Sequence, residues 1–207
     1  MHENPEIPGI LAQTEQAIPM RVRGKALQGK GPPGLRGLWH MKTDYLLHKE
    51  LELILAALMP SNALVIRTML QTGLRVGDVL SLRPEQLAPR MWVTESKTGK
   101  RRQVGLGKAL ERDLRAHSGK TWVFPGHRDK SKPRTRQAVW WDVKRAARAF
   151  RLPQNVGTHS VRKVYAVDLL AQYGDIERVR RALRHDSVST TLIYAMADKL
   201  LRGRAKR

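Results

Sequence analysis

Apolar residues recur along this chain with two different periods, one typical of helices and one typical of strands. The stretch TDYLLHKELELILAAL places Leu47, Leu51, Ile54 and Leu58 three or four positions apart, which predicts an amphipathic helix that stops before Pro60. A second helix is predicted through ALVIRTMLQ, ending at Gly73, and a third, short one through VGDVLSL, so Arg75 is expected at the junction between the two. Towards the C-terminus the helical period returns in TRQAVWWDVKRAARAF, SVRKVYAVDLLAQY, DIERVRRAL and VSTTLIYAMADKLL.

The period changes to two in the middle of the chain. MWVTESKTGKRRQVGL is rich in strand-forming residues on both sides of Ser96, Lys97, Thr98 and Gly99, which predicts a β-hairpin with Lys97 at or near its turn. The short segment WVFPG predicts a third strand. The chain is therefore expected to be α+β and mainly α, with a small three-stranded antiparallel sheet.

Two regions of different composition are expected. Residues 1–40 are rich in proline and glycine and include the basic stretch RVRGKALQGKGPPGLRG, which predicts a flexible arm suited to phosphate contacts. A single folded domain is predicted over residues 41–207, ending in a short C-terminal tail. A length of 207 residues suits one domain and is too short for two large ones.

The charge indicates a polyanion as partner. Lys and Arg number 39 against 18 Asp and Glu, which gives a formal net charge of +21 and a pI near 11.2. Such a chain repels itself unless a polyanion supplies the opposite charge, so nucleic acid is the expected partner. A membrane surface competes for this role, but no run of about 18 apolar residues exists and the basic residues are spread over the whole chain.

Several residue types and motifs are absent from the sequence, and their absence restricts the kinds of site that the protein can form. The absence of cysteine excludes disulfides and thiolate metal sites. There is no HxxxH pair and no carboxylate cluster of the kind that two-metal nucleases use, so no metal or other cofactor is expected. The N-terminus MHENPEIPGILAQTEQ is acidic and contains proline, whereas a secretory signal is basic and then apolar, so we expect an intracellular, cytoplasmic protein.

Four separated motifs together resemble the catalytic domain of the tyrosine recombinase (phage integrase) family, in the order in which that family carries them. TGLRVGDVLSL resembles the first arginine box, ESKTGKRRQV the lysine hairpin, THSVRK the His-x-x-Arg box, and LRHDSVSTTLIYA the second histidine followed by the tyrosine. One such match arises often by chance in an arginine-rich chain, whereas four in register do not. The resemblance covers about residues 41–200 and implies the fold of DNA breaking-rejoining enzymes.

The resemblance implies a site-specific DNA recombinase or integrase, and it assigns a catalytic set. This set comprises Arg75, Lys97, His159, Arg162, His185 and Tyr194. The two arginines would grip the nonbridging oxygens of a phosphodiester, where the transition state gathers negative charge. Tyr194 would attack the phosphorus and form a covalent 3′-phosphotyrosine linkage, which conserves the bond energy and needs neither metal nor ATP.

Supporting roles follow from the same resemblance. His159 would act as the base for the phenol, Lys97 as the acid for the 5′ leaving oxygen, and His185 as a hydrogen-bond donor to the phosphate. Asp78, three residues after Arg75, would hold the guanidinium in place if the helix has begun there. Other basic residues are candidates for contacts with DNA: Arg101, Arg102, Lys144, Arg148 and Lys163.

Each of these residues also has a structural interpretation. Tyr194 lies in an apolar run and suits core packing, as Tyr165 and Tyr173 are expected to do. Arg75 suits a solvated surface, and THSVRK suits a surface helix capped by a threonine or serine. Lys100, Arg101 and Arg102 stand close to Lys97 as alternatives. Trp140 and Trp141 cannot both face one partner, so one of them is expected in the core.

One feature departs from the family, in which a helical core-binding domain usually precedes the catalytic domain. Only about 40 residues precede the first predicted helix, so no separate core-binding domain is expected. DNA would then be held by one domain with its arm, or together with a partner.

The expected partners are double-stranded DNA, further copies of the protein in a dimer or tetramer, and an accessory DNA-bending protein or partner recombinase. The expected setting is a bacterial mobile element or phage, with the protein on the nucleoid. A type IB topoisomerase-like relaxing enzyme and a non-catalytic DNA-binding regulator are the alternatives.

Overall fold

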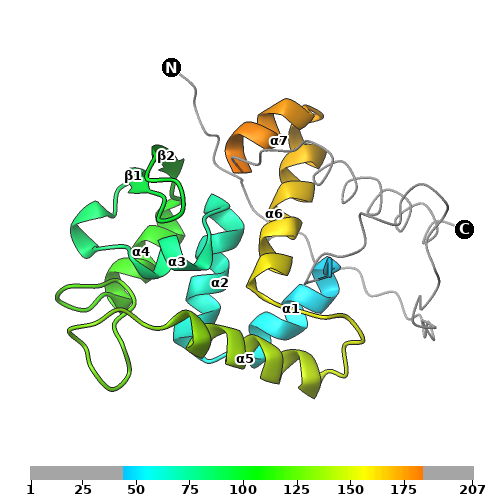
Figure 1. Ribbon diagram of the computed structural model, residues 1–207, viewed down its shortest axis with the longest axis horizontal. Coiled ribbons are helices and arrows are strands. Elements are labelled where there is room, and N and C mark those ends of the chain that lie inside the picture. The colour runs from blue at the N-terminus through cyan, green and yellow to red at the C-terminus, as the bar shows by residue number, and fades with distance from the viewer. Residues whose placement is uncertain (1–43, 184–207) are drawn as a thin grey trace, which may run out of the picture.

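Helices dominate residues 44–183, the part of the chain that the computed structural model describes (Figure 1). The elements are α1 (His48–Ala57), α2 (Pro60–Thr72), α3 (Val76–Leu80), the 3₁₀ turn η2 (Pro84–Gln86), β1 (Arg90–Thr94), β2 (Arg101–Gly105), α4 (Lys108–His117), α5 (Arg136–Ala149), α6 (Thr158–Tyr173) and α7 (Ile176–Leu183). The expected mainly helical α+β class is confirmed. Within these residues no helix is long and apolar enough to cross a membrane.

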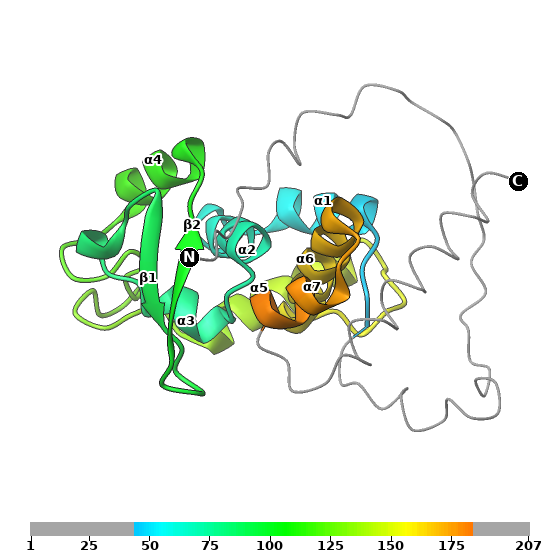
Figure 2. The same ribbon diagram turned by 90° about the horizontal axis from the view of Figure 1, so that it is seen from above.

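Helix α2 lies at the centre, with the hairpin and α4 on one side and α6 and α7 on the other (Figures 1 and 2). It begins at Pro60, which suits a first turn because proline has no N–H to leave unbonded there. It ends at Gly73, as predicted, in the left-handed region with a φ of 64°. A Cβ at Gly73 would lie 2.3 Å from Cε1 of Tyr165, so both the turn and the packing of α6 require glycine.

The amphipathic helices bury most of the apolar positions that their period predicts. Leu51, Ile54 and Leu58 are buried, whereas Leu47 is exposed because it lies at the N-cap, before the first turn of α1. The expected position of Tyr165 in the core is also confirmed, since its ring is buried between α6 and the end of α2. Helix α1 is joined to α6 at the surface, where Nε2 of His48 lies 2.9 Å from Asp168.

Helix α5 departs from expectation at its aromatic residues. The spacing in the sequence predicts a core face made of Val139, Val143, Ala146 and Phe150. The first three are buried, but Phe150 is 39% exposed, because it is the C-cap residue beyond the last turn of α5. The expectation that one of the two tryptophans lies in the core is wrong: Trp140 is 39% exposed and Trp141 is 58% exposed. Both tryptophans lie off the helix face that packs on the core, and their rings contact each other edge to face with centroids 4.7 Å apart.

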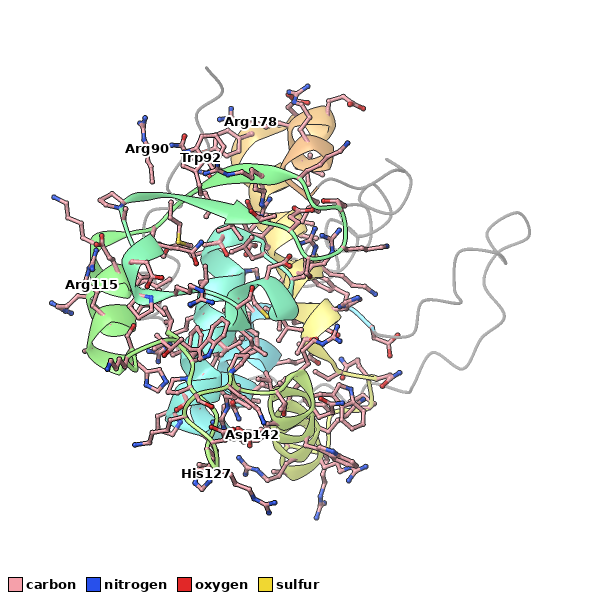
Figure 3. The ribbon with its side chains drawn as sticks, turned by 60° about the vertical axis from the view of Figure 1, so that its left-hand side comes forward. Arg90, Trp92, Arg115, His127, Asp142 and Arg178 are labelled. Atoms are coloured by element: carbon pink, nitrogen blue, oxygen red, sulfur yellow. The ribbon has the colours of Figure 1, made fainter. Side chains whose placement is uncertain are left out.

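The predicted β-hairpin is confirmed. β1 and β2 pair antiparallel from Arg90 opposite Gly105 to Thr94 opposite Arg101. Their side chains alternate between buried and exposed. Figure 3 shows the outer face, where Arg90 and Trp92 are labelled.

The predicted third strand is wrong, because the sheet of the described residues has two strands. In the WVFPG segment the N–H of Val123 donates to the carbonyl of Leu82, and the carbonyl of Phe124 accepts from Arg134. Pro125 has no N–H for a ladder and forms only an isolated bridge with Pro133. The N–H of Val123 and the carbonyl of Phe124 are therefore bonded to residues of loops and not to a neighbouring strand.

Helix α4 was not predicted from the sequence. Half of its ten residues are charged and only Leu114 is completely buried, so few apolar residues mark its inner face. The spacing of Leu106, Leu110 and Leu114 was the available signal. The start of α4 is fixed to α2, because the N–H of Gly107 donates to Gln71 at 3.1 Å.

A buried carboxylate joins α5 to the beginning of α2. Asp142 accepts hydrogen bonds from the N–H of Met59 at 2.8 Å and from Nδ2 of Asn62 at 2.7 Å, and it pairs with Arg145 at 2.6 Å. Figure 3 labels Asp142 on α5. Burial acts to raise the pKa of Asp142, but these donors outweigh burial and hold the pKa below its ordinary value. Ionised Asp142 therefore stabilises the folded state fully at pH values above the ordinary pKa of a carboxyl. This stabilisation is lost as the pH falls through the lowered pKa of the folded state.

We expect Asp142→Ala to lower the free energy of unfolding by about 3 kcal/mol, because it leaves buried donors without their acceptor. Urea denaturation at neutral pH would measure this loss. Asp113→Ala is the control, since Asp113 is an exposed carboxylate beside Arg112 and its loss should change stability by less than about 0.5 kcal/mol. Equal effects of the two substitutions would contradict the anchoring role of Asp142.

Candidate active site

Arg75 lies at the junction between α2 and α3, as predicted. Gly73 ends α2, Leu74 is completely buried, and Arg75 is the N-cap of α3 with an extended backbone. Its side chain is 20% exposed, and its Nη1 donates to Oε2 of Glu95 at 3.0 Å. The guanidinium is therefore fixed to the hairpin and still partly open to solvent.

The predicted support of Arg75 by Asp78 is not what the structure shows. Oδ1 of Asp78 accepts from the backbone N–H of Ser96 at 2.9 Å and from its hydroxyl at 2.7 Å. Helical i, i+3 spacing does not bring Asp78 to Arg75, because Arg75 precedes the first turn of α3. Asp78 instead fastens α3 to the hairpin, and the carboxylate that holds Arg75 is Glu95.

Glu95 is a site residue that the sequence reasoning missed. It is 1% exposed and contacts Arg75 and Arg102, which lie on different elements. Burial acts to raise its pKa, but the hydrogen bond from Arg75, the charge of Arg102 and the hydroxyl of Thr98 together hold the pKa below its ordinary value. The available signal was that Glu95 is the one acidic residue in the basic hairpin sequence from Arg90 to Gly105.

Lys97 is exposed in the turn between β1 and β2. The turn is held by a hydrogen bond from the N–H of Glu95 to the carbonyl of Lys100 at 3.1 Å and by Gly99, whose φ is 66°. Of the alternatives to Lys97, Lys100 and Arg101 are also exposed, whereas Arg102 is buried. Lys97 acts electrostatically on His159, which lies on α6.

His159 and Arg162 occupy the first turns of α6, as predicted. The helix is capped by Gly157, whose N–H donates to the hydroxyl of Ser160 at 3.2 Å. His159 is exposed, whereas Arg162 is only 7% exposed. Arg162 donates from Nη1 to the carbonyl of Gly73 and from Nη2 to the carbonyl of Leu183. It thus ties α6 to the end of α2 and to the end of α7.

Positive charge is concentrated around α6. Burial lowers the pKa of Arg162 to about 10, and repulsion from Arg75 and Arg102 contributes. Burial also lowers the pKa of Lys163 to about 8, although Asp44 counteracts it. The pKa of His159 is lowered by partial desolvation and by the charges of Arg162, Lys163, Arg75 and Lys97. Cations from three separate elements therefore act on one imidazole, which is neutral at neutral pH.

Two expected DNA contacts are buried instead. Arg102 is 8% exposed and donates to the carbonyls of Thr72 and Ala182, and Lys163 is 7% exposed. Arg102 faces inward because alternate residues of β2 point to the core, and Lys163 lies on the packed face of α6. Both side chains therefore face the interior of the domain in this structure.

The other expected contacts remain predictions. Arg101 is exposed and lies over the ring of Trp92, with its Cζ 5.3 Å from the centroid. Lys144 is half-buried beside Trp140 and donates to Asn155. Arg148 is exposed on α5. His185 and Tyr194 lie outside the described residues.

Solved structures that are similar in shape include tyrosine recombinases. A crystal structure of the XerA recombinase has a TM-score of 0.62 at 21% identity and covers 81% of this chain and 65% of that one. The catalytic domain of bacteriophage HP1 integrase has a TM-score of 0.57 at 20% identity, with 74% of this chain and 88% of that one covered. The fold is thus that of tyrosine recombinase catalytic domains.

The sequence comparisons give the family. Residues 44–200 match the phage integrase family, and the chain belongs to it. Among curated relatives, the integrase of Escherichia phage P2 is 30% identical over 173 residues, which are 80% of this chain and 48% of the relative. Tyrosine recombinase XerD of Pseudomonas aeruginosa is 32% identical over 168 residues, 72% of this chain and 56% of the relative. The chain spans about half the length of these two relatives.

Proposed function

We propose that this protein cleaves and rejoins DNA strands at a specific site through a covalent 3′-phosphotyrosine intermediate on Tyr194. The observation that carries the proposal is that two guanidiniums lie together at the end of α2: Arg162 donates to the carbonyl of Gly73, two residues before Arg75. The charges of these arginines and of Lys97 also lower the pKa of His159. These residues come from α3, the hairpin and α6, and the same charges that repel an imidazolium would attract a phosphate.

The arginines would stabilise the transition state. A phosphodiester gains negative charge on its nonbridging oxygens as a nucleophile attacks, and fixed guanidiniums compensate this charge without reorganising. Arg75 is partly exposed beside Glu95, and Arg162 is preorganised by two backbone carbonyls. This electrostatic role is one that a bound cation has in other phosphoryl-transfer enzymes, so the mechanism requires no metal.

Two proton transfers would complete the step. The phenolic oxygen of Tyr194 forms a bond to phosphorus while its proton passes to neutral His159, and His185 donates a hydrogen bond to the phosphate. The bond from phosphorus to the 5′ oxygen breaks, and that oxygen takes a proton from Lys97. One phosphoester replaces another, so a new 5′ hydroxyl can reverse the reaction and reseal a strand without ATP.

The partners would be double-stranded DNA and further copies of the protein. Structures similar to this fold include a lambda integrase dimer bound to a core site and a lambda integrase tetramer bound to a Holliday junction. A net charge of +21 suits binding along a phosphate backbone. We propose an assembly of the same kind on DNA, with an accessory DNA-bending protein or a partner recombinase where the site requires one.

A suicide duplex tests the function. This duplex carries the end sequence of the mobile element and a nick beside the cleavage position. The short fragment that leaves with the new 5′ hydroxyl diffuses away, so the strand cannot be resealed and the adduct is trapped. In buffer with EDTA and without ATP, we expect an SDS-resistant protein–DNA adduct on a 3′ phosphate, mapped to Tyr194 by peptide mass spectrometry. Binding to the duplex without any adduct would contradict the proposal and favour a regulator without catalysis.

The pH dependence of cleavage tests His159 as the base. Because the pKa of His159 is lowered, its neutral form persists below the ordinary histidine value, and the single-turnover rate should stay level from pH 8 to about 6.5. The rate should fall only at lower pH. Lys163→Met removes one of the repelling charges and should move this fall to higher pH. A cleavage rate that has already fallen to its low-pH value above pH 7 would contradict the role of His159 as the base.

A further inference from the structure

The carboxylate of Glu95 occupies an unusual position within the cluster of cations. Its Oε2 accepts from Nη1 of Arg75 at 3.0 Å and from the hydroxyl of Thr98 at 3.1 Å, and its Oε1 lies 3.6 Å from Nε of Arg102. A carboxylate with 1% exposure is costly to bury unless it is paired, and here two guanidiniums pair it. The burial of Glu95 thus depends on these arginines remaining in place.

Glu95 holds the guanidinium of Arg75 at one of its nitrogens, Nη1. Arg75 starts a helix of five residues, and the bond to Glu95 engages Nη1 of its guanidinium. A guanidinium carries five N–H donors, so donors remain for an oxyanion after one nitrogen is held. The carboxylate therefore restricts the rotation of a side chain that is 20% exposed.

Glu95 also fixes the turn that carries Lys97. Its N–H donates to the carbonyl of Lys100, and its carbonyl accepts from Gly99 at 2.8 Å. The next residue, Ser96, is held by Asp78 of α3. Both residues before Lys97 are thus fastened to α3, and the side chain of Glu95 spans from this turn to Arg75.

We propose that Glu95 is a positioning residue that sets Arg75 against Lys97 for the reaction. The role rests on the proposed function: Arg75 would bind the phosphate, Lys97 would protonate the leaving oxygen, and Glu95 would fix the separation of the two. Arg102 extends this connection, because it faces Glu95 and also donates to the carbonyl of Ala182 near the end of α7.

Glutamine cannot replace this carboxylate. It has one acceptor oxygen and one NH₂ group, so in either orientation the NH₂ group faces an arginine N–H on one side. Glu95→Gln therefore either releases Arg75 or holds it only by a weaker, neutral hydrogen bond, and it removes a negative charge. A role in charge balance alone predicts stronger attraction for DNA and unchanged chemistry, whereas a positioning role predicts slower chemistry at similar affinity.

The first measurement does not depend on DNA. In ¹H–¹⁵N spectra of the arginine side chains of the full chain, a held guanidinium gives separately resolved Nη resonances, which Arg75→Lys assigns by their loss. We expect resolved Arg75 resonances in the wild type, averaged resonances in Glu95→Gln, and resolved ones in Glu111→Gln. Glu111 is the matched control, because it pairs with Arg115 at 2.8 Å on α4. Averaged Arg75 resonances in the wild type would overturn the proposal.

The second measurement is single-turnover cleavage of the nicked duplex. We expect Glu95→Gln to cleave 10- to 100-fold more slowly with a duplex Kd within threefold of the wild type, and Glu95→Asp, which keeps the charge, to lie between the two. When the protein already carries Arg75→Lys, adding Glu95→Gln should slow cleavage by less than a further threefold, because Glu95 acts through Arg75. Wild-type cleavage by folded Glu95→Gln, or a fully additive loss, would overturn the positioning role.

The two measurements separate the two proposals. A wild type that forms no adduct contradicts the function, while the Arg75 resonances still decide whether Glu95 holds the guanidinium. An adduct that forms equally in the wild type and in Glu95→Gln leaves the function standing and overturns the role of Glu95. Should Glu95→Gln fail to fold, Glu95→Asp provides both readouts.

Discussion

Tyr194→Phe should abolish the covalent protein–DNA adduct, with a loss of at least about 1000-fold in single-turnover cleavage. Phenylalanine lacks only the phenolic oxygen, so no atom remains to form the bond to phosphorus. The ring is unchanged in size, and packing and DNA affinity should stay close to those of the wild type. Denaturing gels of the suicide-duplex reaction measure the adduct, and gel shifts measure the affinity.

The same substitution separates the catalytic from the structural interpretation of Tyr194. A core tyrosine that loses its hydroxyl costs about 1 kcal/mol of stability and leaves cleavage intact. Tyr173→Phe is the matched control, since Tyr173 ends α6 and contacts Arg178, whose Cζ lies 3.8 Å from the ring centroid. Adduct formation that survives in Tyr194→Phe would show that another residue is the nucleophile.

Arg162→Lys should reduce cleavage by about 100- to 1000-fold and the free energy of unfolding by about 2 kcal/mol. Arg162 donates to the carbonyls of Gly73 and Leu183 from two nitrogens and is almost completely buried. An ammonium is a single point of charge and cannot span both carbonyls while it also faces a phosphate. Single-turnover cleavage and urea denaturation measure the two losses.

Arg112→Lys is the control for this prediction, because Arg112 is exposed on α4, has no role in the proposed site, and the change keeps its charge. We expect it to alter cleavage by less than threefold and stability by less than about 0.5 kcal/mol. A stability loss without a loss of cleavage in Arg162→Lys would show that Arg162 connects helices and does not bind the phosphate. A cleavage loss at unchanged stability would show that its carbonyl contacts contribute little to the fold.

The elements that could be predicted are those with a strong local pattern. The hairpin is recognisable from the alternation around Gly99, and the end of α2 from Gly73, because glycine favours the left-handed backbone that each position requires. Helix α4 was missed because only Leu114 marks its buried face fully, and the false third strand contains Pro125, which a ladder cannot accommodate. Local pattern succeeds where burial follows the period of the element.

Pairing between residues far apart in the chain was harder to predict from the sequence. Asp78 was expected to hold Arg75 from sequence spacing, but Glu95, 20 positions from Arg75, has that role. Arg102 and Lys163 were expected on the DNA surface, but β2 and α6 turn them into the protein. A charged residue in a basic chain does not indicate by itself whether it faces solvent.

The sequence by itself determined the family, the mainly helical class, the hairpin with Lys97 in its turn, and the positions of Arg75, His159 and Arg162 at the starts of helices. These features depend on residue type and short-range spacing, which a linear chain carries explicitly. Only the tertiary structure decided which carboxylate holds Arg75, which cations are buried, and why the pKa of His159 is lowered. Those properties depend on desolvation and on Coulomb interactions between elements far apart in sequence, and both exist only once α2, α6 and the hairpin have packed together.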